Sequence, residues 1–190
     1  MSMERNLAFR LFALLLCWTS LATAQQARAP VEARVPFAPT AFVGSDDLTH
    51  LAYELHVTSI YGDTGPLMPQ GLDVYADNGS TPLASFSAVE LAAMSRPAPA
   101  EHAPVTIEAG KRVVIYVWLT LPAGSVVPHG LRHRMVFTTA MHTTELLDGV
   151  RVPVNTETPV RIGPPLRGGL WLAHEGPGTR IRITGAAWSR

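Results

Sequence analysis

The stretch Arg112–Leu121 (RVVIYVWLTL) decides the fold, because apolar residues occupy both faces of its extended chain. A run of this length and kind is typical of a strand at the core of a β-sandwich. We therefore expect a central strand here, with the Trp118 side chain in the hydrophobic core.

Two segments on either side of this run alternate apolar and polar residues, as half-buried strands do. In residues 50–61 the apolar positions are Leu51, Tyr53, Leu55 and Val57, while His50 and His56 are among the polar ones. In residues 131–138 one face carries Leu131, His133, Met135 and Phe137. The alternation predicts that each segment has one face on the core.

A hairpin and a short helix are expected between these strands. Asn78-Gly79 separates two strand-like segments, 71–77 and 80–86, and this pair tolerates the positive φ angles of a type I′ turn. Ser87 and Glu90 have the spacing of a capping box, which predicts a helix from there to Met94.

Two shorter strands are expected at residues 150–154 and 159–162, and the segment 105–108 leads into the central strand, so the total is seven or eight. Sixteen prolines and fifteen glycines indicate many turns, and no βαβ alternation is present. The sequence therefore predicts an all-β fold, an immunoglobulin-like antiparallel β-sandwich with one short helix, after a cleavable signal peptide. A closed barrel is the alternative.

The N-terminus carries the features of that signal peptide. Arg5 and Arg10 give a positive start, residues 11–18 (LFALLLCW) are apolar, and Ala22-Thr23-Ala24 fits a signal peptidase site before Gln25. The apolar run is shorter than the roughly 20 residues that span a bilayer, so we expect no membrane span in the mature chain. We expect a periplasmic or secreted bacterial protein.

The chain divides into four expected parts. They are a signal peptide (1–24), a flexible Pro/Ala-rich leader (25–41), the β-sandwich domain (42–162) and a linker-like C-terminal tail (163–190). The single cysteine, Cys17, lies in the signal peptide, so the exported domain depends on its hydrophobic core and not on a disulfide.

Charge and spacing favour neither nucleic acid nor metal as a partner. Fifteen basic residues balance fifteen acidic ones, and Arg132 with Arg134 is typical of a solvated strand face. His129 and His133 would lie roughly 13 Å apart on a strand, too far to share a metal ion. We predict no metal site and no cofactor, although His142 could approach His133 across a hairpin.

No arrangement of catalytic residues stands out. The chain has no Gly-x-Ser-x-Gly motif, and Gly44 to Asp47 is better interpreted as a turn. The carboxylates lie at turns or strand ends, where solvated acids are common. They include Asp46, Asp47, Asp73, Asp77, Glu108, Glu145 and Asp148. We predict no catalytic residue, while Trp171 could belong to the core or to a surface on which a ligand stacks.

Five segments together resemble a known family. They are YELHVT (53–58), AGKRVVIYVWLTLP (109–122), LRHR (131–134), GVRVPV (149–154) and GPPLRGGLWLA (163–173). Over roughly residues 48–178 the chain resembles the N-terminal accessory region of exported bacterial lysostaphin-type zinc peptidoglycan endopeptidases. In that family a catalytic domain follows, with zinc held by HxxxD and HxH motifs, and neither motif is present in this sequence.

The resemblance implies a cell-envelope location and kinship with a peptidase. We expect a non-catalytic binding or positioning module whose partner is peptidoglycan or a cell-envelope protein. The alternative is a truncated fragment of an active zinc-dependent peptidoglycan endopeptidase, because the resemblance leads us to expect a catalytic domain beyond residues 179–190. A third hypothesis is a metal chaperone or sensor that uses His129, His133 and His142.

Overall fold

The computed structural model describes residues 28–160, together with residues 163 and 168. The expected signal peptide, most of the expected tail and Trp171 lie outside the described residues. The described part contains nine strands and one helix. They are β1 (Val31–Arg34), β2 (Phe42–Val43), β3 (Thr49–Ser59), β4 (Leu67–Ala76), β5 (Pro82–Ser87), α2 (Ala88–Met94), β6 (Ser95–Arg96), β7 (Arg112–Leu121), β8 (Gly130–Thr139) and β9 (Thr144–Pro153).

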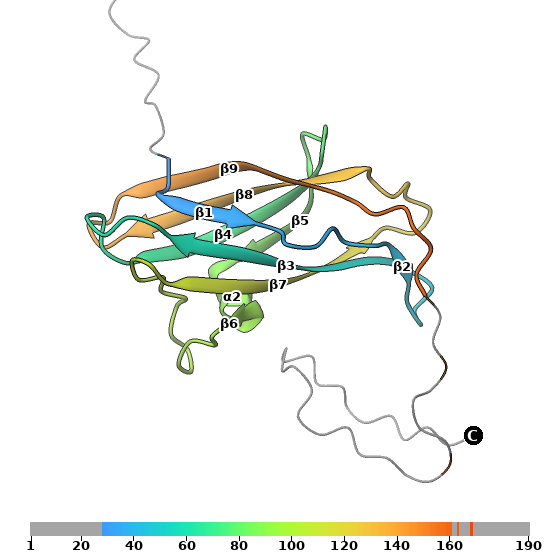
Figure 1. Ribbon diagram of the computed structural model, residues 1–190, viewed down its shortest axis with the longest axis horizontal. Coiled ribbons are helices and arrows are strands. Elements are labelled where there is room, and N and C mark those ends of the chain that lie inside the picture. The colour runs from blue at the N-terminus through green and yellow to red at the C-terminus, as the bar shows by residue number, and fades with distance from the viewer. Residues whose placement is uncertain (1–27, 161–162, 164–167, 169–190) are drawn as a thin grey trace, which may run out of the picture.

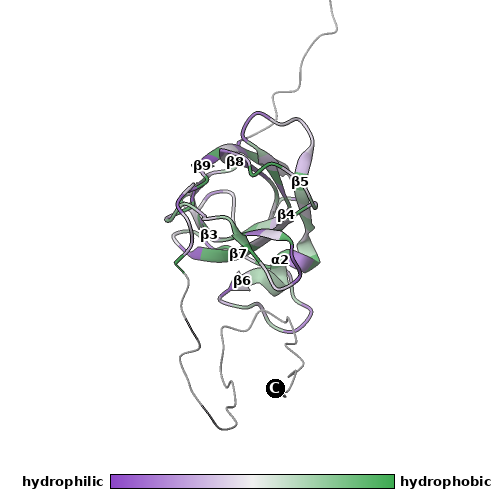
Figure 2. Cartoon of the chain, turned by 90° about the vertical axis from the view of Figure 1, so that its right-hand side faces the viewer, coloured by the Kyte–Doolittle hydropathy of each residue, from purple (hydrophilic) through white to green (hydrophobic). Residues whose placement is uncertain are grey.

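Two antiparallel sheets face each other across the hydrophobic core (Figures 1 and 2). One sheet has the strand order β1-β3-β7-β6, with β2 also paired to β3, and the other has the order β5-β4-β8-β9. These orders correspond to the A-B-E-D and C′-C-F-G sheets of immunoglobulin-like domains. The predicted all-β sandwich with one short helix is therefore confirmed.

The inward residues of the long strands form the core. In β3 and β8 the buried positions alternate along the strand, which confirms the predicted faces of residues 50–61 and 131–138. The largest fully buried side chains are Phe137, Leu51, Leu55, Leu67, Leu72, Leu91, Ile107, Ile115, Leu119, Leu121, Leu131 and Met135. No helix in the described part of the chain is long and apolar enough to cross a membrane.

The helix α2 begins where the sequence predicts. The Ser87 side chain accepts a hydrogen bond from the Glu90 backbone N–H, and the Glu90 carboxylate accepts one from the Ser87 backbone N–H. This reciprocal capping box occupies backbone donors that have no partner within the helix. Leu91 is fully buried, so it attaches the helix to the core.

Part of the expected leader is a strand, which corrects the prediction of a flexible segment over 25–41. Val31–Arg34 pairs with the second half of β3, and Ala29 is buried. The backbone N–H of Ala29 also donates to the Leu146 carbonyl, so this segment joins the two sheets along one side. Flanking prolines obscure the strand in the sequence, but proline is compatible with a strand at a sheet edge.

Two smaller expectations are also wrong. The hairpin between β4 and β5 forms, but neither Asn78 nor Gly79 has a positive φ. The turn bond runs from the Gly79 N–H to the Ala76 carbonyl, so Asp77 and Asn78 are the central residues and the turn is not of type I′. Pro159 and Val160 lie outside any strand, and residues 161–162 of that expected strand are not described.

A hydrogen bond between two buried side chains connects the sheets. Tyr53 on β3 and His133 on β8 occupy the B and F strands, which a disulfide joins in antibody domains. The Tyr53 hydroxyl lies 2.7 Å from His133 Nε2, and His133 Nδ1 lies 2.9 Å from the Val150 carbonyl oxygen.

The two contacts define the tautomer of His133. A carbonyl oxygen only accepts, so Nδ1 carries the proton, and Nε2 accepts the hydrogen bond from the Tyr53 hydroxyl. Burial lowers the pKa of His133 and raises the pKa of Tyr53. Both side chains are therefore neutral in the folded protein near neutral pH.

Replacing Tyr53 with phenylalanine tests this connection. Tyr53→Phe leaves the buried Nε2 of His133 without a donor, which costs about 1–3 kcal/mol of unfolding free energy. Tyr116→Phe, on the outer face of β7, is the matched control and changes stability by less than about 0.5 kcal/mol. Equal urea denaturation midpoints for the two variants would contradict the assignment.

The buried neutral histidine also predicts a pH dependence. An unfolded histidine binds a proton near pH 6.5, whereas folded His133 titrates at lower pH, so the unfolding free energy falls as pH drops below about 6.5. One group contributes at most about 1.4 kcal/mol per pH unit. Urea unfolding between about pH 7.5 and 5.5 measures the slope of the unfolding free energy against pH. We expect His133→Gln to reduce this slope and His142→Asn, the control, to leave it unchanged. An unchanged slope in His133→Gln would refute the prediction.

Candidate functional site

The candidate binding site lies on the outer face of the β1-β3-β7-β6 sheet, near the end that carries β2. We call it the aromatic face and define it by Phe42 of β2, His50 of β3 and Trp118 of β7. The ring centroids lie 5.5 Å apart for Phe42 and His50, 5.6 Å for Phe42 and Trp118, and 5.2 Å for His50 and Trp118.

Trp118 is a surface residue, which corrects the prediction that it lies in the core. Its side chain is 48% exposed, and β7 alternates buried and accessible positions along its length. Val113, Ile115, Val117, Leu119 and Leu121 point inward, so Trp118 points outward with Tyr116. The apolar character of both faces of β7 concealed this division in the sequence.

Strand pairing brings the three rings together. Phe42 is the partner of His50 across β2 and β3, and Thr120 is the partner of His50 across β3 and β7. Trp118 is two residues before Thr120, so it projects from the same face of β7. Its own partner is Ala52, whose small side chain leaves the indole uncovered on that side.

Hydrogen bonds fix the orientation of the indole. Trp118 Nε1 lies 3.1 Å from His50 Nδ1, and an indole N–H only donates, so Nδ1 accepts. His50 Nε2 then carries the proton and donates to Asp46 Oδ1 at 2.9 Å. The bond from His50, followed by that from the Leu48 backbone N–H, lowers the pKa of Asp46.

Asp46, His50 and Thr120 bring together a carboxylate, an imidazole and a hydroxyl, the groups of a hydrolase catalytic triad. Their hydrogen bonds instead hold the Trp118 indole in place. Thr120 Oγ1 lies 3.1 Å from His50 Nδ1, the atom that already accepts from the Trp118 indole. Because Nδ1 has a single lone pair, the imidazole is committed to holding the indole and is not free to activate the hydroxyl.

The outer face of the other sheet has a different character. There Arg132 pairs with Asp148 at 2.8 Å, Arg134 with Asp73 at 3.6 Å, and Arg151 with Asp77. The Arg132 guanidinium also lies over the Tyr75 ring, 4.2 Å from its centroid. This face is solvated and charge-balanced, as the sequence predicts for Arg132 and Arg134.

The histidines of the metal hypothesis are not brought together. His133 is buried against Tyr53, whereas His142 lies in the turn between β8 and β9 and His129 lies before β8. In residues 28–160, 163 and 168, no group of three or more His, Cys, Asp or Glu side chains is placed to hold a metal ion. Gly44 to Asp47 forms the expected turn, in which the Asp47 N–H donates to the Gly44 carbonyl.

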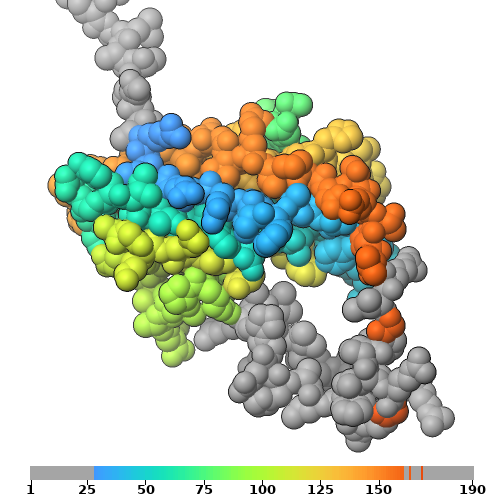
Figure 3. Space-filling view, viewed as in Figure 1, coloured from blue at the N-terminus to red at the C-terminus, as the bar shows by residue number. Residues whose placement is uncertain are grey.

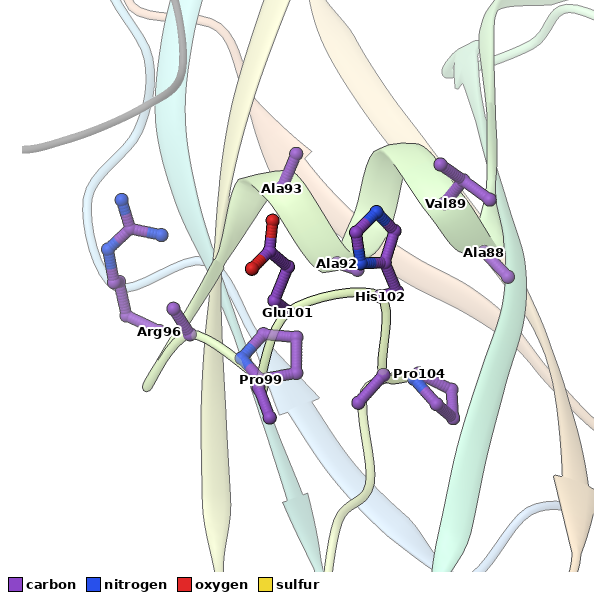
Figure 4. A pocket seen from close by; sticks show the side chains of 12 residues that line it. Ala88, Val89, Ala92, Ala93, Arg96, Pro99, Glu101, His102 and Pro104 are labelled. Carbon is purple, nitrogen blue, oxygen red and sulfur yellow. The ribbon is translucent and has the colours of Figure 1, made fainter.

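A concave region lies between α2 and the segment that follows it (Figure 4). Its volume is about 660 Å³. The helix and this segment extend outward from the sandwich body (Figure 3).

In comparisons with known proteins, no family model and no curated protein matches the chain.

Burial predicts different stability effects for two large aromatic residues. Trp118→Ala removes a half-exposed ring and costs about 1–2 kcal/mol, whereas Phe137→Ala leaves a cavity in the core and costs about 3–5 kcal/mol. Thermal or urea unfolding of both variants measures the difference. A larger loss for Trp118→Ala would mean that its ring supports the core.

Proposed function

We propose that this protein is a non-catalytic, exported binding module of the bacterial cell envelope, and that its aromatic face binds the glycan strands of peptidoglycan. The observation that carries the proposal is the half-exposed Trp118 indole, held in one orientation by its hydrogen bond to His50. The sequence supports the cellular setting, through its signal-peptide features and its resemblance to the accessory region of wall peptidases.

A fixed, accessible indole suits a sugar ring. Pyranose rings present C–H groups on their faces, and a tryptophan combines a broad apolar surface with few rotatable bonds. Because His50 and Phe42 already restrict the ring, binding loses little side-chain entropy. The aromatic face therefore offers a preformed stacking surface.

Asp46 gives this surface a polar border. Its side chain is 51% exposed, and its Oδ1 accepts from His50 and from the Leu48 backbone N–H. Ionised carboxylates accept further hydrogen bonds at their second oxygen, and sugar hydroxyl and amide groups are donors. Stacking on Trp118 with hydrogen bonding to Asp46 is the proposed recognition mode.

Sedimentation with purified peptidoglycan sacculi tests the function. We expect the chain to sediment with sacculi, and Trp118→Ala to weaken this by about tenfold because the stacking surface is lost. Val126→Ala, in the loop between β7 and β8, is the matched control and binds like the unmodified protein.

Two outcomes would reject parts of the proposal. Sedimentation no greater than that of an inert protein of similar size would remove the peptidoglycan function. Binding that survives Trp118→Ala unchanged would instead remove the aromatic face as its site. Far-UV circular dichroism confirms that each variant is folded before the comparison.

A further inference from the structure

The outer face of the β1-β3-β7-β6 sheet continues beyond the aromatic face. β2 pairs with residues 49–50 at one end of β3, whereas β1 pairs with residues 56–59 at the other end (Figure 1). β7 runs beside the whole of this length, and its outward side chains form one line along the strand. They are Thr120, Trp118, Tyr116, Val114 and Arg112. The aromatic face and Arg112 therefore belong to one continuous surface.

Two arginines occupy the end of this surface that carries β1. Arg34 of β1 is the partner of His56, and Arg112 of β7 is the partner of Thr58, so β3 lies between them. Alternate residues of a strand share a face, and so do residues paired across strands. Both arginines are exposed. We call Arg34 and Arg112 the arginine end.

The positive charge of the arginine end has no carboxylate partner within the described part of the chain. Neither Arg34 nor Arg112 forms an ion pair there, although Glu32 of β1 is also paired with Thr58. Glu54 of β3 accepts a hydrogen bond from His56 Nε2 at 2.8 Å. On the other sheet, by contrast, three arginines each pair with an aspartate.

The Arg112 guanidinium is oriented for an anionic ligand. Its Nε donates to Thr58 Oγ1 at 3.0 Å, which holds the side chain beside β3. Its Nη1 and Nη2 atoms make no hydrogen bond to another described residue. Parallel N–H groups of this kind bind both oxygens of a carboxylate. The arginine end therefore suits a ligand that carries carboxylates.

The distance from Trp118 fits the peptide part of peptidoglycan. Arg112 precedes Trp118 by six residues, roughly 20 Å along an extended strand. Glycan strands of peptidoglycan carry short stem peptides, and these peptides contain several carboxylates. An extended peptide of about five residues spans about 17 Å, and the long arginine side chain reaches toward it. A stem peptide attached to a sugar on Trp118 can therefore reach the arginine end.

We propose that the arginine end binds stem-peptide carboxylates of the same peptidoglycan strand whose sugar stacks on Trp118. The inference rests on the proposed glycan function and adds the peptide part of the ligand to it. Arg34 and Arg112 bind carboxylates on the two sides of β3, while the glycan occupies the aromatic face. The unpaired charge and the length match favour this ligand.

Sedimentation with two preparations of sacculi tests the inference. Both preparations are free of phosphate polymers, and an amidase has removed the stem peptides from one of them. We expect the unmodified protein to bind intact sacculi at least about tenfold more tightly than the denuded ones, because the denuded glycan lacks the carboxylates. About 1 M salt should reduce this difference, since it screens exposed charges.

Two double variants localise the binding. Arg34→Gln with Arg112→Gln should reduce binding to intact sacculi to the level of denuded ones, and should leave binding to denuded sacculi unchanged. Arg134→Gln with Arg151→Gln removes the same charge from the other sheet and is the matched control, which should bind both preparations like the unmodified protein. Far-UV circular dichroism checks that each double variant is folded.

The outcomes separate this inference from the function on which it rests. Equal binding of the unmodified protein to intact and denuded sacculi would overturn the inference and leave the glycan function standing. Full binding of the Arg34→Gln, Arg112→Gln variant to intact sacculi would also overturn it, because the peptides would then lie elsewhere. Binding to neither preparation would reject the glycan function itself, whereas Trp118→Ala should weaken binding to both.

Discussion

The hydrogen bond between Tyr53 and His133 is the interaction on which the architecture depends. It joins β3 to β8, the two strands that a disulfide connects in antibody domains, in a part of the chain that has no cysteine. The bond requires neutral His133 with its proton on Nδ1, which the Val150 carbonyl enforces. A buried polar pair is stabilising only when each atom has its partner, and here both ring nitrogens of His133 have one.

The Tyr53–His133 bond joins the two sheets within the core, and the outer faces of the sheets differ in character. On the β4, β8 and β9 side, Arg132 and its neighbours are neutralised by aspartates, which keeps that face solvated. On the β3 and β7 side, His50 uses both ring nitrogens to hold Asp46 and the Trp118 indole. A neutral histidine with both ring nitrogens hydrogen-bonded therefore stabilises the core at His133 and fixes the aromatic face at His50.

The sequence predicted the features that depend on neighbouring residues. Alternation identified β3 and β8, and the capping box at Ser87 located the start of α2. It failed where a distant partner decides the outcome. Val31–Arg34 becomes a strand because β3 offers an edge. The error at Trp118 has a local cause instead, because this residue points outward through its position in the β7 alternation. Counting odd and even positions in residues 112–121 would have separated five aliphatic inward residues from an outward face with two aromatic rings.

The central claim is that Trp118 is the contact point for glycan, and its indole N–H resonance tests this most directly. The measurement is a titration of the whole chain with a soluble, β-linked tetramer of N-acetylglucosamine, followed by nuclear magnetic resonance. The account predicts a saturable shift of the Trp118 indole N–H signal, which His50 positions. A shift of the Trp171 signal with the Trp118 signal unmoved would contradict it.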